Sequence, residues 1–276
     1  MLPGAIGAGV VQINLLIDVV IASLLPSGSV SFLYYADRVN QLPLGVIGVA
    51  VGTALLPMLS CQLRAGDEEE AARSLNRAME FALLMTIPAA AALMIIPYPV
   101  IAVLFERGAF GSPETGATAA ALAAYALGLP AYVLIKVLGP GFFAREDTVT
   151  PVKIAAGCVV INLVLNLLLM GPFVHVGIVL ATAISAWINA GLLMFVLRRR
   201  GHFRSDLRLR KAIPRVLLAS AAMAAAIRFS MDGLAGYAAA DSVQRTIALA
   251  VVITIGLAAF AAAALLFGAA RREDIK

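Results

Sequence analysis

Long apolar stretches recur along this chain and are separated by short polar segments. A helix that spans a bilayer needs roughly 20 mostly apolar residues. No region shows the alternation of polar and apolar residues over many short segments that is typical of membrane β-barrels. The pattern therefore predicts an all-α, polytopic membrane protein with eight transmembrane helices. The predicted spans cover residues 3–25, 31–60, 79–104, 115–138, 152–171, 176–197, 212–230 and 245–268.

The composition supports this class. Of the 276 residues, 62% are hydrophobic and 13% are charged, and the mean hydropathy is +0.95. Soluble domains are about 25% charged, and disordered chains combine low hydrophobicity with high charge. The composition therefore excludes both classes. The basic residues lie in short loops rather than on one face of a domain, so we expect membrane lipids, and no nucleic acid, as partners.

Loops rich in Lys and Arg alternate along the chain with loops that have almost none. Lys and Arg gather in segments 61–78, 139–151, 198–211 and the C-terminal tail, whereas 26–30, 105–114 and 172–175 carry almost none. Positive residues collect on the cytoplasmic side of membrane proteins. The alternation predicts a multi-pass membrane protein with both termini in the cytoplasm. The opening residues MLPGAIGAGVVQ lack a basic segment, so we expect no cleavable signal peptide before the first span.

The first span contains Asn14 and Asp18, which lie four residues apart and so share a helix face. No basic residue lies within one turn of Asp18. A carboxyl group in hydrocarbon needs a hydrogen bond, a proton or a cation. Both a structural hydrogen bond and an ion or proton role remain open from the residues alone.

A second polar group lies about two turns inside the second span. Asp37 and Arg38 are followed by Asn40, Gln41 and Pro43. Arginine presents a planar fork of donors that suits phosphate. We expect Arg38 to be the only Lys or Arg deep within a span and to bind an anionic substrate, with Asp37, Asn40 and Gln41 as further substrate contacts. The alternative is that the Arg38 side chain extends to the membrane interface.

A third polar group divides between the fifth and sixth spans. Asn162 and Asn166 lie four residues apart in the fifth span, and Thr182 and Ser185 lie in the sixth. Their oxygens could join Asp18 around a hard monovalent cation, which prefers oxygen ligands. Alternatively, these side chains only bond one helix to another.

Motifs of soluble enzymes are absent from the sequence. It contains no phosphate-binding P-loop, no HExxH and no CxxC, and its two histidines, His175 and His202, fall in predicted loops. We therefore expect a protein that is not an enzyme and has no cofactor other than a possible coupling ion.

Three segments together resemble one known family. These are FLYYADRVNQLPLGVIGVAVGTALLP, VLFERGAF at 103–110 and GFFAREDTVTPVKI at 141–154. They are similar to the MurJ (MviN) family of lipid II flippases, in the multidrug/oligosaccharidyl-lipid/polysaccharide exporter superfamily. The resemblance covers only the C-terminal part of that family, helices seven to fourteen of fourteen. It implies that residues 1–200 form the second six-helix lobe and that residues 201–276 form a basic loop and two additional helices.

The resemblance also implies roles for individual residues. The family moves undecaprenyl-linked peptidoglycan precursor across the membrane by alternating access, and Arg38 matches its cavity arginine on the eighth helix, with Asp37 beside it. Some members have a sodium site, and Asp18, Asn162, Asn166 and Thr182 occupy the matching places. The Ile178 carbonyl is a further ligand. Asn166 departs from the pattern, because the family has an acidic residue there; a proton is the alternative coupling ion.

The first lobe of the family has no counterpart in this sequence. We therefore expect a truncated or split gene product that pairs with a separate N-terminal six-helix lobe, or a fragment that does not transport alone. Two other hypotheses are an exporter of another lipid-linked oligosaccharide or drug, and a non-transporting membrane scaffold.

Overall fold

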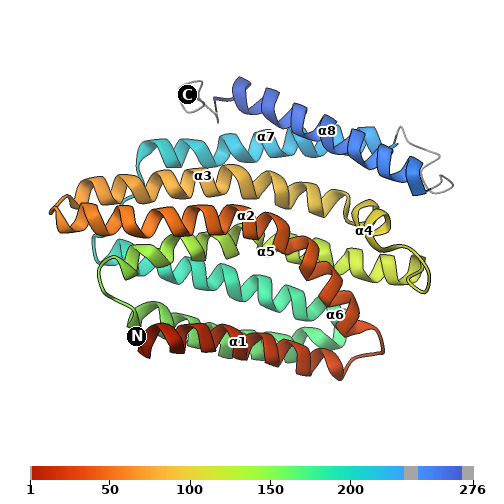
Figure 1. Ribbon diagram of the computed structural model, residues 1–276, viewed down its shortest axis with the longest axis horizontal. Coiled ribbons are helices and arrows are strands. Elements are labelled where there is room, and N and C mark those ends of the chain that lie inside the picture. The colour runs from red at the N-terminus through yellow and green to blue at the C-terminus, as the bar shows by residue number, and fades with distance from the viewer. Residues whose placement is uncertain (1, 233–241, 269–276) are drawn as a thin grey trace.

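The computed structural model describes residues 2–232 and 242–268, and it is built from helices (Figure 1). Within these residues no strand forms, and an isolated bridge joins Arg107 to Phe110. The prediction of an all-α fold is confirmed. The helices are α1 (Leu2–Ser23), α2 (Ser29–Arg64), α3 (Glu68–Ile95), α4 (Pro97–Phe105), α5 (Ser112–Phe143), α6 (Val149–Arg199), α7 (Leu207–Asp232) and α8 (Ser242–Leu266).

Helix α6 is two membrane spans joined without a loop. Its 51 residues would reach about 75 Å as a straight helix, more than twice a hydrocarbon core of about 30 Å. At Val174 the backbone leaves the helical region, with φ 51° and ψ −128°. The Ser185 hydroxyl then donates to the Cys158 carbonyl at 2.8 Å, so the two halves run back to back.

The helices agree with eight spans. Six of the described helices are long and apolar enough to cross a membrane, and α6 is one of them. Its two halves count separately, and α1, with 22 residues, reaches about 33 Å. The prediction for 79–104 needs a correction, because α3 begins earlier and the helix breaks at Ile96, before Pro97. Proline disfavours the α conformation of the preceding residue, which explains the break.

Helix α5 lies at the centre of the packing. It contacts α2, α3, α4 and α6, while α7 packs on α3 and α8 packs on α7 (Figure 1). The largest apolar cluster includes Leu75, Phe142, Leu197 and Phe203, all nearly inaccessible to solvent. The last two helices therefore form an outer layer on α3, and α1 packs against α6 on the other side.

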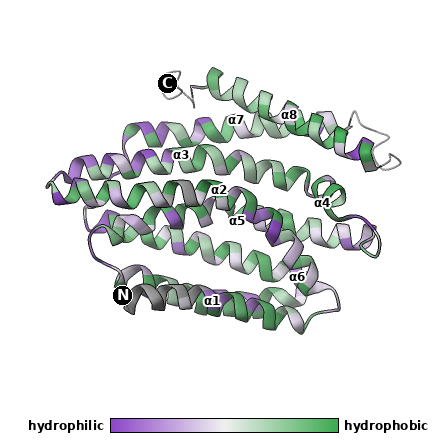
Figure 2. Ribbon diagram, in the orientation of Figure 1, coloured by the Kyte–Doolittle hydropathy of each residue, from purple (hydrophilic) through white to green (hydrophobic). Residues whose placement is uncertain are grey.

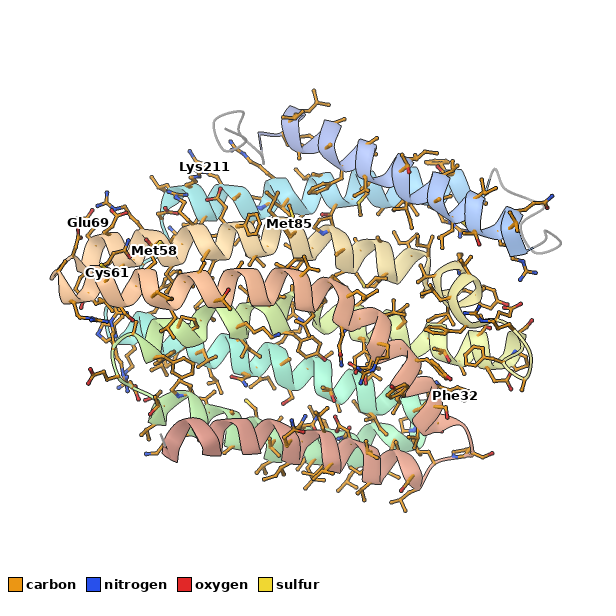
Figure 3. The ribbon with its side chains drawn as sticks, viewed as in Figure 1. Phe32, Met58, Cys61, Glu69, Met85 and Lys211 are labelled. Carbon is orange, nitrogen blue, oxygen red and sulfur yellow. The ribbon has the colours of Figure 1, made fainter. Side chains whose placement is uncertain are left out.

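The two ends of the bundle differ in chemistry. At the end where α2–α3, α5–α6 and α6–α7 connect, which we call the basic end, Arg145 binds Glu68 at 2.6 Å and Arg200 binds Asp147. The opposite end, which we call the bare end, holds a cluster of aromatic rings around Tyr35. Figure 2 shows hydrophilic residues mainly at helix ends and in short stretches within helices. Figure 3 labels Cys61, Glu69 and Lys211 towards the basic end and Phe32 at the bare end.

Candidate functional site

The first polar site joins α1 to both halves of α6. We call it the Asp18 cluster: Asp18, Asn162, Asn166, Ile178 and Thr182. Asn166 Nδ2 donates to Asp18 Oδ1 at 2.7 Å and to Asn162 Oδ1 at 2.9 Å. Thr182 Oγ1 lies 3.0 Å from both Asp18 Oδ2 and the Ile178 carbonyl oxygen. The structure therefore brings together all five residues that were predicted to meet there.

Helical spacing and the turn at Val174 explain this convergence. Asn162 and Asn166 share one face of the first half of α6, and Ile178 and Thr182 share one face of the second. The turn folds these faces together, and Asn162 Nδ2 lies 3.1 Å from Thr182 Oγ1. Both asparagines are fully buried, so their amides face protein rather than lipid.

The orientation of the Asn162 amide decides what this cluster can bind. With its nitrogen towards α1, the amide donates to Asn14 Oδ1 at 3.1 Å and to Asp18 Oδ1 at 3.2 Å, and it accepts from Thr182 Oγ1. With its oxygen towards α1, three oxygens face one another at these distances. Oxygens that converge in this way need a cation or a proton between them.

The donor set fits a small monovalent cation. Asn166 Oδ1 is buried and has no hydrogen-bond partner among the described residues, so one further oxygen is free to act as a ligand. Asp18 supplies a single carboxylate, and neutral oxygens supply the rest. Within the described residues, no group of three or more His, Cys, Asp or Glu side chains could hold a metal ion. A hard cation of low charge suits such a set better than a divalent ion.

The second polar site lies along α2 near the bare end. We call it the Arg38 cluster: Tyr34, Asp37, Arg38 and Gln41. Arg38 Nη1 donates to Gln41 Oε1 at 3.4 Å, and Gln41 Nε2 donates to Asp37 Oδ2. The Tyr34 ring covers the guanidinium, with Arg38 Cζ 4.8 Å from the ring centroid. Gln41 thus connects the two charged residues, which do not pair directly.

One edge of the Arg38 guanidinium stays free. Its Nη1 and one of its faces are occupied, but Nε and Nη2 have no hydrogen-bond partner within the part of the chain that the structure describes. Arg38 and Gln41 are exposed on the protein surface. Nε and Nη2 together form a fork that matches two oxygens of a phosphate group. The cluster can therefore bind an anionic group from outside this helix bundle.

Asn40 does not join this surface. Its side chain is 2% exposed, and its Oδ1 is buried without a partner among the described residues. It lies on the side of α2 that faces the bundle interior, whereas Arg38 and Gln41 lie on the opposite side. A substrate contact by Asn40 stays a prediction, and the structure does not place it with the other three residues.

A second basic side chain was missed from the sequence. Lys136 lies in α5, about two turns before its end at Phe143, and its stem crosses α2 at Gly48. A methyl group at Gly48 would meet Lys136 Cδ at 2.7 Å and Nζ at 3.3 Å. Because Gly48 is near the middle of α2, the prediction that Arg38 is the only basic residue deep within a span is wrong. The available signal was the position of Lys136 inside an apolar span together with the glycine stripe of α2.

Comparison with known proteins identifies the family. A family model described as "Lipid II flippase MurJ" matches residues 1–234. The chain belongs to the MurJ lipid II flippase family. It is 47% identical over 277 residues to a probable lipid II flippase MurJ of Rhizobium meliloti (strain 1021), covering 100% of this chain and 52% of the relative. A MurJ relative from Vibrio cholerae is 36% identical over 276 residues, with the same coverage of both chains.

Solved structures agree with this membership. "Lipid II flippase MurJ, inward closed conformation" superposes with a TM-score of 0.80 at 28% identity, covering 97% of this chain and 52% of that one. A multidrug resistance MATE family transporter in an outward-facing conformation gives a TM-score of 0.63 at 20% identity, covering 95% and 62%. The second likeness shows the fold alone. The chain spans about half the length of the curated MurJ relatives it matches.

Proposed function

We propose that this chain acts as the C-terminal half of a lipid II flippase, which moves undecaprenyl-linked peptidoglycan precursor across the cytoplasmic membrane by alternating access. Membership of the MurJ family supports this function. In this proposal the protein is a transporter rather than an enzyme. Residues 1–200 form one lobe, and 201–276 form the basic loop with the two outer helices.

The free edge of Arg38 is the observation that carries the proposal. A charged group within a membrane span costs several kcal/mol unless it faces water or a partner, and Arg38 is exposed with Nε and Nη2 available. The diphosphate of lipid II supplies the oxygens that this fork needs. Gln41 accepts a hydrogen bond from Nη1 of the guanidinium and is itself held by Asp37, which restrains Arg38 while Nε and Nη2 stay available.

The proposed partner of the chain is a six-helix first lobe. The matches cover about half of each relative, which is consistent with a second half that completes the cavity. In this arrangement Arg38 faces the space between the lobes, and rocking of one lobe against the other exposes the head group alternately to each side of the membrane.

An Arg38→Ala variant tests the proposal. We would join this chain to the N-terminal half of the Rhizobium meliloti relative and ask whether the product restores growth of a flippase-depleted strain. Arg38→Ala should abolish growth while the protein still inserts, and Arg38→Lys should recover little, because an ammonium lacks the fork. Arg73→Ala, which removes an exposed arginine paired with Glu70, is the matched control and should grow normally. Normal growth of Arg38→Ala would contradict the proposal.

We propose further that the Asp18 cluster binds Na⁺, or alternatively H⁺, as the coupling ion. Asp18, Asn162, Asn166, the Ile178 carbonyl and Thr182 would hold it. The support is the convergence of their oxygens and the unpaired Asn166 Oδ1. A bound cation would neutralise the carboxylate charge within the membrane.

We also propose a location in the inner membrane with the basic end and both termini in the cytoplasm. The concentration of arginines at the basic end supports this orientation. Single cysteines introduced at Ser27 and Val174, at the bare end, should react with a membrane-impermeant maleimide added to the periplasm. A cysteine at Gly201 should react only after the cells are opened, and periplasmic labelling at Gly201 would overturn the orientation.

A further inference from the structure

Lys136 carries an ammonium group to the middle of the bundle. Its stem crosses α2 at Gly48, close to the midpoint of Ser29–Arg64. No described residue forms a hydrogen bond or ion pair with its Nζ, and the side chain is exposed. A lysine at this depth is costly in hydrocarbon, so it needs water or an anion beside it. Its surroundings are therefore those of a binding group rather than of a structural ion pair.

Gly48 makes this position possible. Any side chain there would overlap the Lys136 stem, because an added Cβ would lie 2.7 Å from Cδ. Positions 34, 41 and 48 are seven residues apart, or about two helical turns, so they lie on nearly the same face of α2. Lys136 thus lies on the same strip of α2 as Tyr34 and Gln41 of the Arg38 cluster.

Arg38 and the Lys136 crossing point are well separated along α2. Arg38 and Gly48 are ten residues apart along α2, which corresponds to about 15 Å. A single diphosphate is too short to bridge that distance. A ligand that engages both cations must therefore be elongated and carry a second anionic group remote from its phosphates.

We propose that Lys136 forms a second anion subsite for a carboxylate on the peptide of the lipid-linked head group. This rests on the proposed function, which puts the diphosphate at Arg38. In the head group of lipid II, the sugar that is linked to the diphosphate also bears the peptide, and the free carboxylates of that peptide lie well away from the phosphates. Arg38 then binds the diphosphate and Lys136 binds a peptide carboxylate of the same ligand. Lys136 therefore favours a peptide-bearing head group over a bare diphosphate.

Three ligands test this assignment on this chain joined to the N-terminal half of the Rhizobium meliloti relative and held in lipid nanodiscs. They are lipid II, lipid II with its peptide carboxylates converted to amides, and undecaprenyl diphosphate. Lys136→Gln should weaken binding of unmodified lipid II about tenfold, the loss expected for one charge-assisted hydrogen bond. The same variant should bind the amidated lipid II and undecaprenyl diphosphate as the unmutated chain does.

Two further variants separate this role from a structural one. Gly48→Ala keeps the charge but displaces the Lys136 stem, and it should reproduce the selective loss. Lys153→Gln removes an exposed lysine near the start of α6 and should leave all three affinities unchanged. Equal losses for all three ligands, or no loss for lipid II, in Lys136→Gln would overturn the inference.

Arg38→Gln distinguishes a failure of the inference from a failure of the proposed function. This variant should weaken all three ligands, because each contains the diphosphate. If Arg38→Gln has no effect, or the unmutated joined protein binds none of the three, the proposed function fails and the inference fails with it. If Arg38→Gln weakens all three but Lys136→Gln weakens none, only the Lys136 subsite is wrong.

Discussion

The Asp18 cluster and the Arg38 cluster each contain a charged residue within a membrane span, but they accommodate it in opposite ways. Asp18 receives hydrogen bonds from Asn166 and Thr182, which belong to the two halves of another helix. Within the described ranges, the hydrogen bond and the ring contact of Arg38 both involve its own helix, and one edge of its guanidinium stays free. The first site is closed and made from three spans, whereas the second is open and made from one.

The difference indicates what each site can bind. In a closed site the protein supplies most of the ligands, so it favours a small ion that fits among them. An open site leaves hydrogen-bond donors unpaired until a large ligand arrives from outside the bundle. The free-energy penalty of these unpaired donors is removed only when the ligand binds. Tyr34 and Gln41 restrict the Arg38 side chain beforehand, which reduces the conformational entropy lost when the ligand binds.

The largest change in stability is expected at Asp18, and it tests whether the closed site binds an ion. If Na⁺ binds there, raising Na⁺ to about 100 times its Kd should stabilise the folded chain by about 2.7 kcal/mol. Asp18→Asn should remove this gain, as measured by thermal unfolding of the purified chain in Na⁺ against choline. Asp147→Asn, the same change at the basic end, should keep it. Persistence of the Na⁺ effect in Asp18→Asn would contradict Na⁺ binding at the Asp18 cluster.

A smaller effect is expected at Tyr34, which sharpens the description of the open site. A cation–π contact at an exposed position contributes about 0.5–1 kcal/mol, so Tyr34→Leu should weaken undecaprenyl diphosphate binding about two- to fivefold. Tyr34→Phe retains the ring and should bind nearly as well as the unmutated chain. Equal binding by Tyr34→Leu and the unmutated chain in a titration would mean that the ring does not position Arg38.

The smallest effect is expected at the basic end, where the charges are outside the spans. Partial burial of Asp147 opposes its ionisation, but hydrogen bonds from Thr150 and Arg200 lower its pKa to about 2. A carboxyl group with a lowered pKa stabilises the folded state at pH values above its unfolded pKa of about 3.9 and loses this contribution as the pH falls towards 2.

Asp147→Asn should therefore cost about 0.5–1 kcal/mol at pH 7, since the pair is partly exposed. The difference from the unmutated chain should shrink as the pH falls below about 4. Thermal unfolding across a pH series measures it, with Glu146→Gln as the control. A difference that grows on acidification would exclude this ion pair as its cause.

Helical periodicity explains what could be predicted about the sites. Asn162 with Asn166, and Ile178 with Thr182, follow a four-residue spacing, so their common faces were readable from the sequence. Their meeting with Asp18 depends on which helices neighbour each other, and the family resemblance supplied that information. The break at Ile96 was missed, because the surrounding residues are continuously apolar and only Pro97 and Pro99 mark it.

Long side chains and helix rotation explain what could not be predicted. The sequence places Lys136 beside a predicted loop, but α5 continues for about two turns beyond it, and the flexible Lys136 stem crosses Gly48 on another helix. Asn40 follows Arg38 by only two residues, yet it faces the interior, because two residues correspond to about 200° of rotation. Proximity in sequence within a helix therefore does not imply a shared surface.

The turn at Val174 determines which residues of the two halves of α6 face Asp18. No loop separates the two halves of α6. The residues between Asn166 and Ile178 therefore fix how the second half is rotated relative to the first. One added residue would rotate the second half by about 100° relative to the first and carry Thr182 away from Asp18. A longer, flexible connection would let the two faces slip past each other. The direct connection leaves one register, in which α1 meets both pairs of oxygens at the same depth.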